Sequence, residues 1–379
     1  MRNFRIGSLL GIPILVNPSW FILFALTTWL LATQVFPSVL TSVGNVTYFA
    51  MAAASVLVFF ISIVVHELAH SVVAKRYGIP VRSITLFVFG GVAQITRDAT
   101  RPIAELLMAV AGPLMSLVIG GLFLFLWWAL AAGDSSPVGL VLFWLAWMNV
   151  VLAIFNLVPA FPMDGGRVFR SLLWLISGNY HGATRIACWT GRGIAWMTIG
   201  AGVLSLVQVP IPLISQPLGG AWLVLIGVFL ENAARQSLLQ NRLVRTLRQY
   251  SAGQLMVADP PVVEGAMSVG SLARGVLELN PRVCYFVEDE GRLAGILSSY
   301  QLRAVPEQLW DSTTAAQVMV PRQRLKATGP EIPVSDVLLE MEAANLLHMP
   351  VVREGRVIGV IGRDRILGVL RNAGLLGRV

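Results

Sequence analysis

The chain has 379 residues, of which 56% are hydrophobic and 13% charged, and its mean hydropathy is +0.72. So few polar side chains could not cover the surface of an ordinary water-soluble protein, and composition therefore excludes that class. Loops that orient membrane helices explain the net charge of +8 better than nucleic-acid binding does, and we expect no nucleic-acid partner. Cys188 and Cys284 lie far apart, so neither a disulfide framework nor a cysteine metal site is indicated.

Charge density divides the chain near residue 240. Residues 1–238 contain 12 Lys and Arg and 6 Asp and Glu, whereas residues 239–379 contain 16 and 14. We therefore expect a membrane domain over 1–238, a basic linker helix over 239–252 and a soluble module over 253–371. The linker places Arg242, Arg245 and Arg248 along one helical stripe, which could contact anionic lipid or could simply set the topology.

Apolar runs long enough to cross a bilayer, which takes about 20 residues, predict an α-helical polytopic membrane domain. Six spans are expected, at about 18–36, 48–74, 103–132, 138–158, 193–209 and 219–237. Basic residues cluster before the first span, between the second and third, between the fourth and fifth, and after the sixth. The alternate loops carry only Asp134, so the positive-inside rule places both termini in the cytoplasm of a multi-pass cell-membrane protein, most simply in a prokaryotic plasma membrane.

The second expected span runs without a charge from Met51 to Val65 and continues directly into His66-Glu67-Leu68-Ala69-His70. Histidines four residues apart lie on one face of a helix and can share a metal ion, and the adjacent glutamate can reach a water on that metal. Ionisable residues inside a membrane span are costly and usually functional. A buried hydrogen-bonded cluster of the same three side chains is the plainer alternative.

Residues 81–96 follow this span and are rich in β-formers, with Gly90-Gly91 at their middle, which predicts a β-hairpin. An exposed strand edge there could accept an unwound substrate by strand addition. A plain connecting hairpin explains the pattern equally well.

A catalytic zinc site needs a third protein ligand besides two histidines. The acidic residues available in the membrane part are Asp98, Glu105, Asp134, Asp164 and Glu231. Asp164 is favoured because it lies in the segment 156–167, where prolines interrupt the helix and glycines allow close backbone approach. Broken backbone at membrane depth is tolerated only where it is buried or lines a cavity. Glu105 remains an alternative ligand from the third span.

Together these motifs resemble the site-2 proteases, zinc metalloproteases that cleave transmembrane segments of other proteins. The resemblance rests on His66-Glu67-x-x-His70, on Gly112-Pro113, and on the segment from Asn156 to Gly166 with its Pro-Met-Asp-Gly-Gly core. It implies that His66, His70 and Asp164 bind one Zn²⁺ per chain and that Glu67 is the general base. It also suggests that Asn156 binds substrate or stabilises the oxyanion.

Residues 253–371 contain an internal repeat with a period of about 60 residues, each copy reading as helix, strand, Gly-containing turn, strand and helix. The pattern resembles a tandem pair of CBS domains, at about 253–305 and 315–371. Such a pair implies a cytoplasmic control module, a homodimer through the CBS domains, and adenine-nucleotide binding by Ser or Thr with Asp three residues later. Here those positions hold Ser298 with Gln301 and Gly362 with Arg365, so nucleotide binding is doubtful.

The sequence thus predicts an intramembrane zinc metalloprotease that acts on transmembrane protein substrates in the lipid bilayer and is modulated by a CBS pair. The alternative from another class is a CBS-regulated transporter or channel with an intramembrane His/Glu ion site. A catalytically dead scaffold is disfavoured because all the ligands and the base are present.

Overall fold

The computed structural model describes residues 3–41, 43–87, 90–95, 99–131, 136–207, 209, 217–276, 284–289, 292–354 and 356–375. The chain forms two compact units, Met1–Leu238 and Leu239–Val379. Each unit has cores of its own: the first packs its helices around Val56 and Phe60, and the second has separate cores around Val287 and Ile361. They are described separately below.

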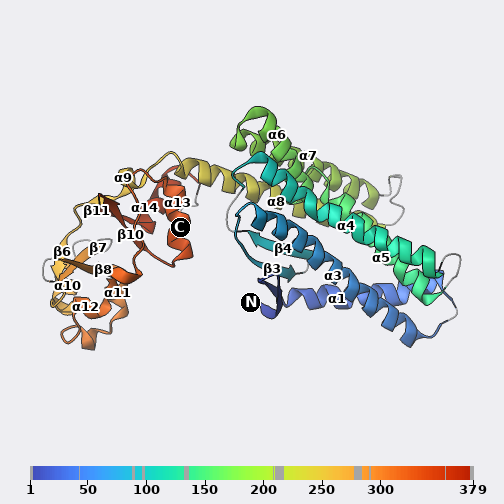
Figure 1. The fold of residues 1–379 in the computed structure, drawn as a ribbon, viewed down its shortest axis with the longest axis horizontal. Coiled ribbons are helices and arrows are strands. Elements are labelled where there is room, and N and C mark those ends of the chain that lie inside the picture. The colour runs from blue at the N-terminus through green and yellow to red at the C-terminus, as the bar shows by residue number, and fades with distance from the viewer. Residues whose placement is uncertain are drawn as a thin grey trace. The chain divides into compact units, whose positions relative to one another are not determined.

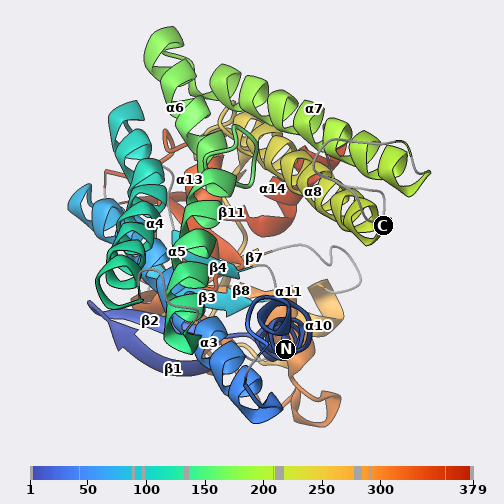
Figure 2. The same cartoon turned by 90° about the vertical axis from the view of Figure 1, so that its right-hand side faces the viewer.

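Helices form most of the first unit (Figures 1 and 2). In chain order they are α1 (Ser19–Leu30), a π-helical turn (Leu31–Val35), α2 (Phe36–Val39), α3 (Asn45–Arg76), α4 (Pro102–Ala131), α5 (Pro137–Asn156), α6 (Asp164–Ser177), α7 (Tyr180–Leu206) and α8 (Pro217–Leu247). The long helices α3, α4 and α5 pack side by side, and α6 packs on α4 and α7. This packing brings the two histidines on α3, the Gly-Pro pair on α4 and the start of α6 into one region.

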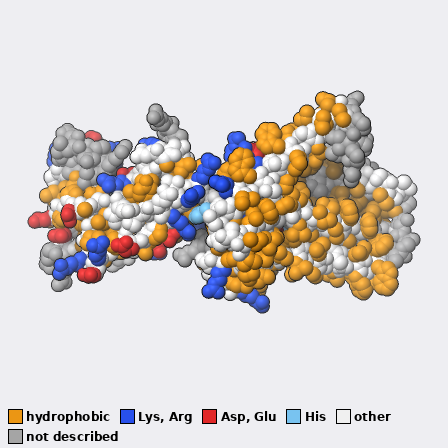
Figure 3. Space-filling view, turned by 90° about the horizontal axis from the view of Figure 1, so that it is seen from above, with side chains coloured by type: hydrophobic (Ala, Val, Ile, Leu, Met, Phe, Trp, Pro, Cys, Tyr) orange, Lys and Arg blue, Asp and Glu red, His pale blue; other side chains and the backbone are white. Residues whose placement is uncertain are grey.

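Four helical stretches among the described residues are long and apolar enough to cross a membrane: Ser19–Val39, Asn45–Arg76, Pro102–Leu130 and Pro137–Asn156. They correspond to the first four predicted spans. The fifth and sixth predicted spans fall on α7 and α8, and their crossing of the membrane stays a prediction. On the face drawn in Figure 3, hydrophobic side chains, shown in orange, cover much of this unit. The exposed hydrophobic residues of the unit include Trp29, Phe125, Trp128 and Ile176, as expected of a surface that faces lipid.

A four-stranded sheet, ordered β1-β2-β3-β4, accompanies these helices. Its strands are β1 (Phe4–Leu9), β2 (Ile12–Val16), β3 (Val81–Phe87) and β4 (Gly90–Ile95). The predicted hairpin is present as antiparallel β3 and β4, but Gly90 and Gly91 belong to β4 rather than to its turn. The N-terminal strands were not predicted; β1 is exposed along its whole length, whereas β2 alternates between buried and half-buried residues.

The second unit contains two similar α/β halves. The first half has α9 (Ala252–Leu255), β5 (Val257–Ala258), β6 (Val262–Glu264), α10 (Val269–Val276), β7 (Cys284–Asp289), β8 (Arg292–Ser298) and α11 (Ser299–Ala304). The second has α12 (Ala315–Val318), β9 (Val320–Pro321), α13 (Val334–Ala343), β10 (His348–Arg353), β11 (Arg356–Gly362) and α14 (Arg363–Asn372), with 3₁₀ turns at Glu307–Leu309 and Arg322–Arg324. The Gly-containing turns expected between the paired strands of the two halves, at Gly291 and Gly355, lie outside the described residues.

The two halves exchange their short strands. The sheets are ordered β6-β7-β8-β9 and β10-β11-β5, so β9 completes the first half and β5 the second. Gly295 and Gly359 occupy equivalent positions where these strands meet: an added Cβ would lie 2.5 Å from Val320 O and 2.6 Å from Val257 O, respectively. The repeat seen in the sequence is therefore a pseudo-symmetric pair whose halves depend on each other. Residues 239–247, which belong to the expected linker helix over 239–252, form the last part of α8.

Candidate metal centre

His66 and His70 project from one face of α3, and both are buried, with 3% and 5% of their surface exposed. Their Nε2 atoms lie 3.2 Å apart. Each ring is oriented through its other nitrogen: His66 Nδ1 is 2.8 Å from Ser116 Oγ, and His70 Nδ1 is 2.6 Å from the carbonyl oxygen of Met108. A carbonyl only accepts, so His70 Nδ1 carries the proton and its Nε2 presents a lone pair.

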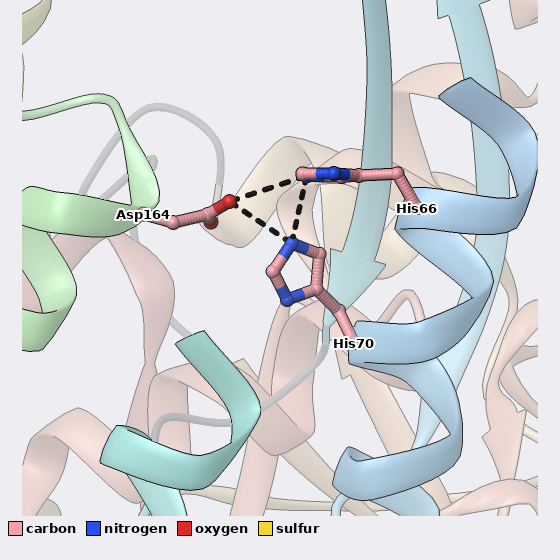
Figure 4. Close-up of side chains that lie close together, drawn as sticks. All are labelled: His66, His70 and Asp164. Atoms are coloured by element: carbon pink, nitrogen blue, oxygen red, sulfur yellow. Dashed lines mark hydrogen bonds and ion pairs between the residues drawn. The ribbon is translucent and has the colours of Figure 1, made fainter. Parts of the chain in front are cut away.

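Asp164 meets these two nitrogens from another part of the chain (Figure 4). It is the first residue of α6, and its Oδ2 lies 3.2 Å from His66 Nε2 and 3.1 Å from His70 Nε2. Only 15% of its side chain is exposed. The three ligand atoms thus form a small triangle, and within the described parts of the chain no other group of three His, Cys, Asp or Glu residues has this arrangement.

The donor set fits zinc. Two ligand atoms bound at about 2.0–2.1 Å to one tetrahedral zinc lie roughly 3.3 Å apart. The three separations of 3.1–3.2 Å in the structure are close to this spacing. Both Nε2 atoms converge on one carboxylate oxygen, an arrangement that a cation or a proton between the three atoms stabilises. Two histidines and one carboxylate also match the ligands of catalytic zinc sites that keep a fourth position open.

Glycines on α4 and at the start of α6 make room for this centre. An added Cβ at Gly112 on α4 would overlap His70 Nε2 and lie 2.6 Å from His66 Nε2, so only glycine lets α4 pack against both rings. Gly165 and Gly166, which follow Asp164, face the backbone of Leu157–Val158 and Ala160–Phe161, and an added Cβ at either position would clash with it. The interrupted segment after α5 therefore folds back onto the start of α6 and delivers Asp164 to the histidines.

Glu67 lies beside the histidines and contacts the sheet. Its Oε2 accepts a hydrogen bond of 3.1 Å from the backbone N–H of Ala93 on β4. Gly91 on the same strand packs against it, since an added Cβ there would lie 2.8 Å from Glu67 Cγ. β4 is an edge strand, because it is the last strand in the sheet order. The Glu67 carboxylate, which binds Ala93, therefore lies at the unpaired edge of β4.

The other candidate residues make different contacts or lie outside the described residues. The Asn156 amide donates to the carbonyl oxygen of Leu152, one turn earlier on α5, at 3.0 Å. Glu105 is buried in an ion pair with Arg170, which makes it a partner of an arginine rather than a metal ligand. Glu231 pairs with Arg192 at 2.8 Å and more loosely with Arg235, one turn further along α8, at 3.8 Å. Asp98 and Asp134 lie outside the described residues.

Sequence reasoning missed the two residues that orient the histidines. Met108 acts through its backbone carbonyl, which leaves no signal in the side-chain pattern. Ser116 lies between Gly112 and Gly120 at a spacing of four residues, a pattern that by itself indicates only close helix packing. Met108 and Ser116 each lie four residues from Gly112 on α4. The signal available in the sequence was therefore Ser116, a polar residue close to the Gly112-Pro113 pair inside an apolar span.

The second unit shows no comparable centre among its described residues. Ser298 and Gln301 bond to each other as the capping box of α11, which occupies the groups that would face a ribose in a nucleotide-binding CBS domain. Arg365 Nη1 lies 3.5 Å from the carbonyl oxygen of Leu255. Burial raises the pKa of the Cys284 thiol to about 12, so this cysteine stays protonated and is not a nucleophile.

The fold and site are those of a class of membrane metallopeptidases, with an HExxH helix and a distant aspartate whose side chains could hold one metal ion. Comparisons with known proteins agree. The profile of Peptidase family M50 matches residues 54–135 and 131–199, and that of the CBS domain matches residues 315–372.

Relatives extend this match over nearly the whole chain. A candidate zinc metalloprotease of Synechocystis sp., sll0528, is 31% identical over 381 residues, which cover 98% of this chain and 96% of the relative. Rip3 of Mycobacterium tuberculosis, also a candidate zinc metalloprotease, is 30% identical over 94% of this chain and 90% of its own. The solved structure of a site-2 protease from Methanocaldococcus jannaschii is 30% identical, with a TM-score of 0.43 over 62% of this chain and 95% of that chain. The chain belongs to peptidase family M50, the site-2 type of zinc metalloprotease.

Proposed function

We propose that this protein hydrolyses peptide bonds in or near the transmembrane segments of other membrane proteins, in regulated intramembrane proteolysis. The observation that carries the proposal is the meeting of His66, His70 and Asp164 within a unit built from apolar helices, with Glu67 beside them. A transport site would need neither the glutamate next to two convergent imidazoles nor the broken segment that delivers a third ligand.

In the proposed reaction His66, His70 and Asp164 hold zinc, which supplies Lewis acidity toward the scissile carbonyl and the attacking water. Glu67 takes a proton from that water and later delivers it to the leaving amine. The hydrogen bond from Ala93 N–H holds the Glu67 carboxylate in place for this transfer. Hydrolysis consumes water, so the partly exposed Glu67 needs an aqueous path from one side of the membrane.

Substrate would bind along β4. The carbonyl of an intact helix is shielded by its own hydrogen bonds, so a transmembrane substrate must unwind before attack. An unwound segment can pair with the outer edge of β4, whose Ala93 already bonds Glu67, and would then lie beside the catalytic residues. Asn156, at the end of α5 and before the segment that leads to Asp164, would bind the substrate or stabilise the oxyanion.

Both termini and the CBS pair would face the cytoplasm, because Arg and Lys gather in the loops assigned to that side. Substituted-cysteine labelling tests this orientation. A cysteine at position 44 should react with an impermeant reagent from outside the cell, whereas a reporter fused after Val379 should be cytoplasmic. Labelling at position 44 only from the cytoplasmic side would invert the topology.

The CBS pair would modulate cleavage through α8. In the first unit Leu230 and Leu238 of this helix pack with Ala160 and Phe161, which precede Asp164, and in the second unit its Leu247 lies in the core around Ile361. A change in the second unit can therefore bias the segment that carries Asp164 by shifting between states that already exist. The pair would also mediate homodimerisation, whereas adenine nucleotides would bind weakly, given the paired Ser298 and Gln301.

Glu67→Gln tests the proposed function. The amide cannot accept a proton, so the variant should keep its zinc and fold but lose cleavage of a transmembrane substrate by a factor of about 10² or more. Comparing membrane proteins that accumulate at full length in cells with wild-type and Glu67→Gln enzyme would also identify substrates. Undiminished proteolysis by the variant would reject the mechanism, and ion flux through reconstituted protein without proteolysis would favour a transporter.

A further inference from the structure

One face of α4 contacts both histidine rings and also binds α6, the helix that begins with Asp164. Glu105, Met108, Gly112 and Ser116 follow one another at spacings of three and four residues, which places them on one side of the helix. Met108 binds the His70 ring, Gly112 admits both rings, and Ser116 binds the His66 ring. Glu105, at the start of this stripe, contacts neither histidine but binds Arg170 of α6, the helix that begins with Asp164.

The Glu105–Arg170 pair is deeply buried, with 1% and 8% of the two side chains exposed. Both Nε, at 2.8 Å, and Nη2 of Arg170 donate to the same oxygen, Oε1. The other oxygen, Oε2, is buried and has no hydrogen-bond partner among the described residues. Glu105 therefore depends on Arg170, and a buried ion pair that loses one partner leaves an uncompensated charge.

Aromatic rings hold the arginine from two directions. Its guanidinium carbon lies 5.1 Å from the centre of the Phe161 ring and 4.8 Å from that of Tyr180. Phe161 belongs to the interrupted segment before Asp164, and Tyr180 begins α7. Arg170 thus joins the start of α4, the broken segment and α7 around α6.

We propose that Glu105 and Arg170 are positioning residues that fix Asp164 against the two histidines. Through Met108 and Ser116, α4 sets the orientation of both imidazoles, and through Glu105 it sets the position of the helix that supplies the third ligand. All three ligands are then aligned to one helix face. Outer contacts of this kind typically change metal affinity by about 10- to 100-fold when they are removed. This inference rests on the proposed metal centre and goes beyond it.

The test measures zinc dissociation from the full chain into a chelator, together with the visible absorption spectrum of the Co²⁺-substituted protein, which reports ligand geometry. Glu105→Gln should speed zinc loss about tenfold and alter the Co²⁺ spectrum. Arg170→Lys keeps the charge but not the planar fork, so it should give a smaller change in the same direction. Should Glu105→Gln fail to fold, Arg170→Lys supplies the measurement.

The matched control is Glu231→Gln, which breaks the pair of Glu231 with Arg192 between α7 and α8, with 10% and 19% of those side chains exposed. It should lower thermal stability but leave zinc dissociation and the Co²⁺ spectrum within about twofold of wild type. The proposal would be overturned if both Glu105→Gln and Arg170→Lys released zinc at the wild-type rate and kept the wild-type Co²⁺ spectrum. It would also be overturned if Glu231→Gln changed zinc release and the spectrum as much as they do. A wild-type protein that binds no metal would instead refute the proposed centre itself.

Discussion

The two units differ most in where they place their charges. In the membrane unit, two described ion pairs join different helices, Glu105–Arg170 and Glu231–Arg192, and their side chains are at most 19% exposed. In the second unit the described ion pairs lie at the surface, with side chains 41–89% exposed: Arg274–Asp311, Arg353–Glu331 and Arg363–Glu342. Exposed pairs contribute about 0–1 kcal/mol each, whereas a charge inside an apolar unit is costly and must be compensated. The buried pairs of the membrane unit therefore join its helices, and one of them, Glu105–Arg170, connects α4 to α6, the helix that begins with Asp164.

Glycines allow close contacts in both units. Gly112 packs against the two histidine rings in the first unit, and Gly359 packs against the exchanged strand β5 in the second. Gly112→Ala should have the largest effect, since its Cβ would lie within 2.6 Å of His66 Nε2 and overlap His70 Nε2. We expect zinc content and proteolysis to fall tenfold or more, roughly as for lost metal-site contacts. Metal analysis of the purified variant checks this.

Gly121→Ala is the control on the same helix, because an added Cβ there meets nothing within 4 Å. It should keep zinc and activity. If Gly112→Ala retains full zinc, the rings do not pack against α4 as described.

Gly359→Ala should have a smaller effect that is confined to the second unit. Its Cβ would lie 2.6 Å from Val257 O on the exchanged strand β5, so the free energy of unfolding of this unit should fall by about 1–3 kcal/mol. Hydrogen exchange of the amides in β5 and β11 would measure the loss. Zinc content should be unchanged. Loss of zinc in this variant would contradict the expectation that its effect is confined to the second unit.

The control for this variant is Gly368→Ala on α14, where an added Cβ meets nothing within 4 Å. Alanine is the better helix former, so exchange rates should stay equal or slow slightly. Faster exchange in both variants would mean that the contact at Val257 is not the cause.

The smallest expected effect concerns coupling between the units. Inserting Gly-Ser-Gly-Ser after Gln240 interrupts α8 between Leu238 and Leu247, which pack in different units. Cleavage rate or substrate choice should change by about fivefold, at the lower end of typical coupling between sites, while zinc content stays constant. Kinetics on a reconstituted substrate would measure this. The same insertion after Leu375 should have no effect, and equal rates in both proteins would leave the CBS pair without influence on cleavage.

Local spacing predicted much of this molecule. His66, Glu67 and His70 were recognisable because four residues are about one helical turn, and the hairpin over 81–96 followed from its β-formers. The pairing of Glu105 with Arg170 joins residues 65 positions apart, which periodicity within one segment cannot reveal. Asp164 was favoured over Glu105 from its broken, Gly-rich surroundings, and the structure explains this through Gly165 and Gly166, which need close backbone contacts. Helix α6 was not predicted, because it is too short and too polar to be recognised as a membrane span.

Metal analysis of purified wild-type and Asp164→Ala protein tests the central claim most directly. Asp164 Oδ2 lies 3.1 and 3.2 Å from the two histidine nitrogens, so its removal deletes one of three proposed ligands. The wild type should contain about one zinc per chain, and Asp164→Ala should lose most of it, far more than Glu105→Ala does. Full zinc retention by Asp164→Ala, with zinc stripped from Glu105→Ala, would contradict the account.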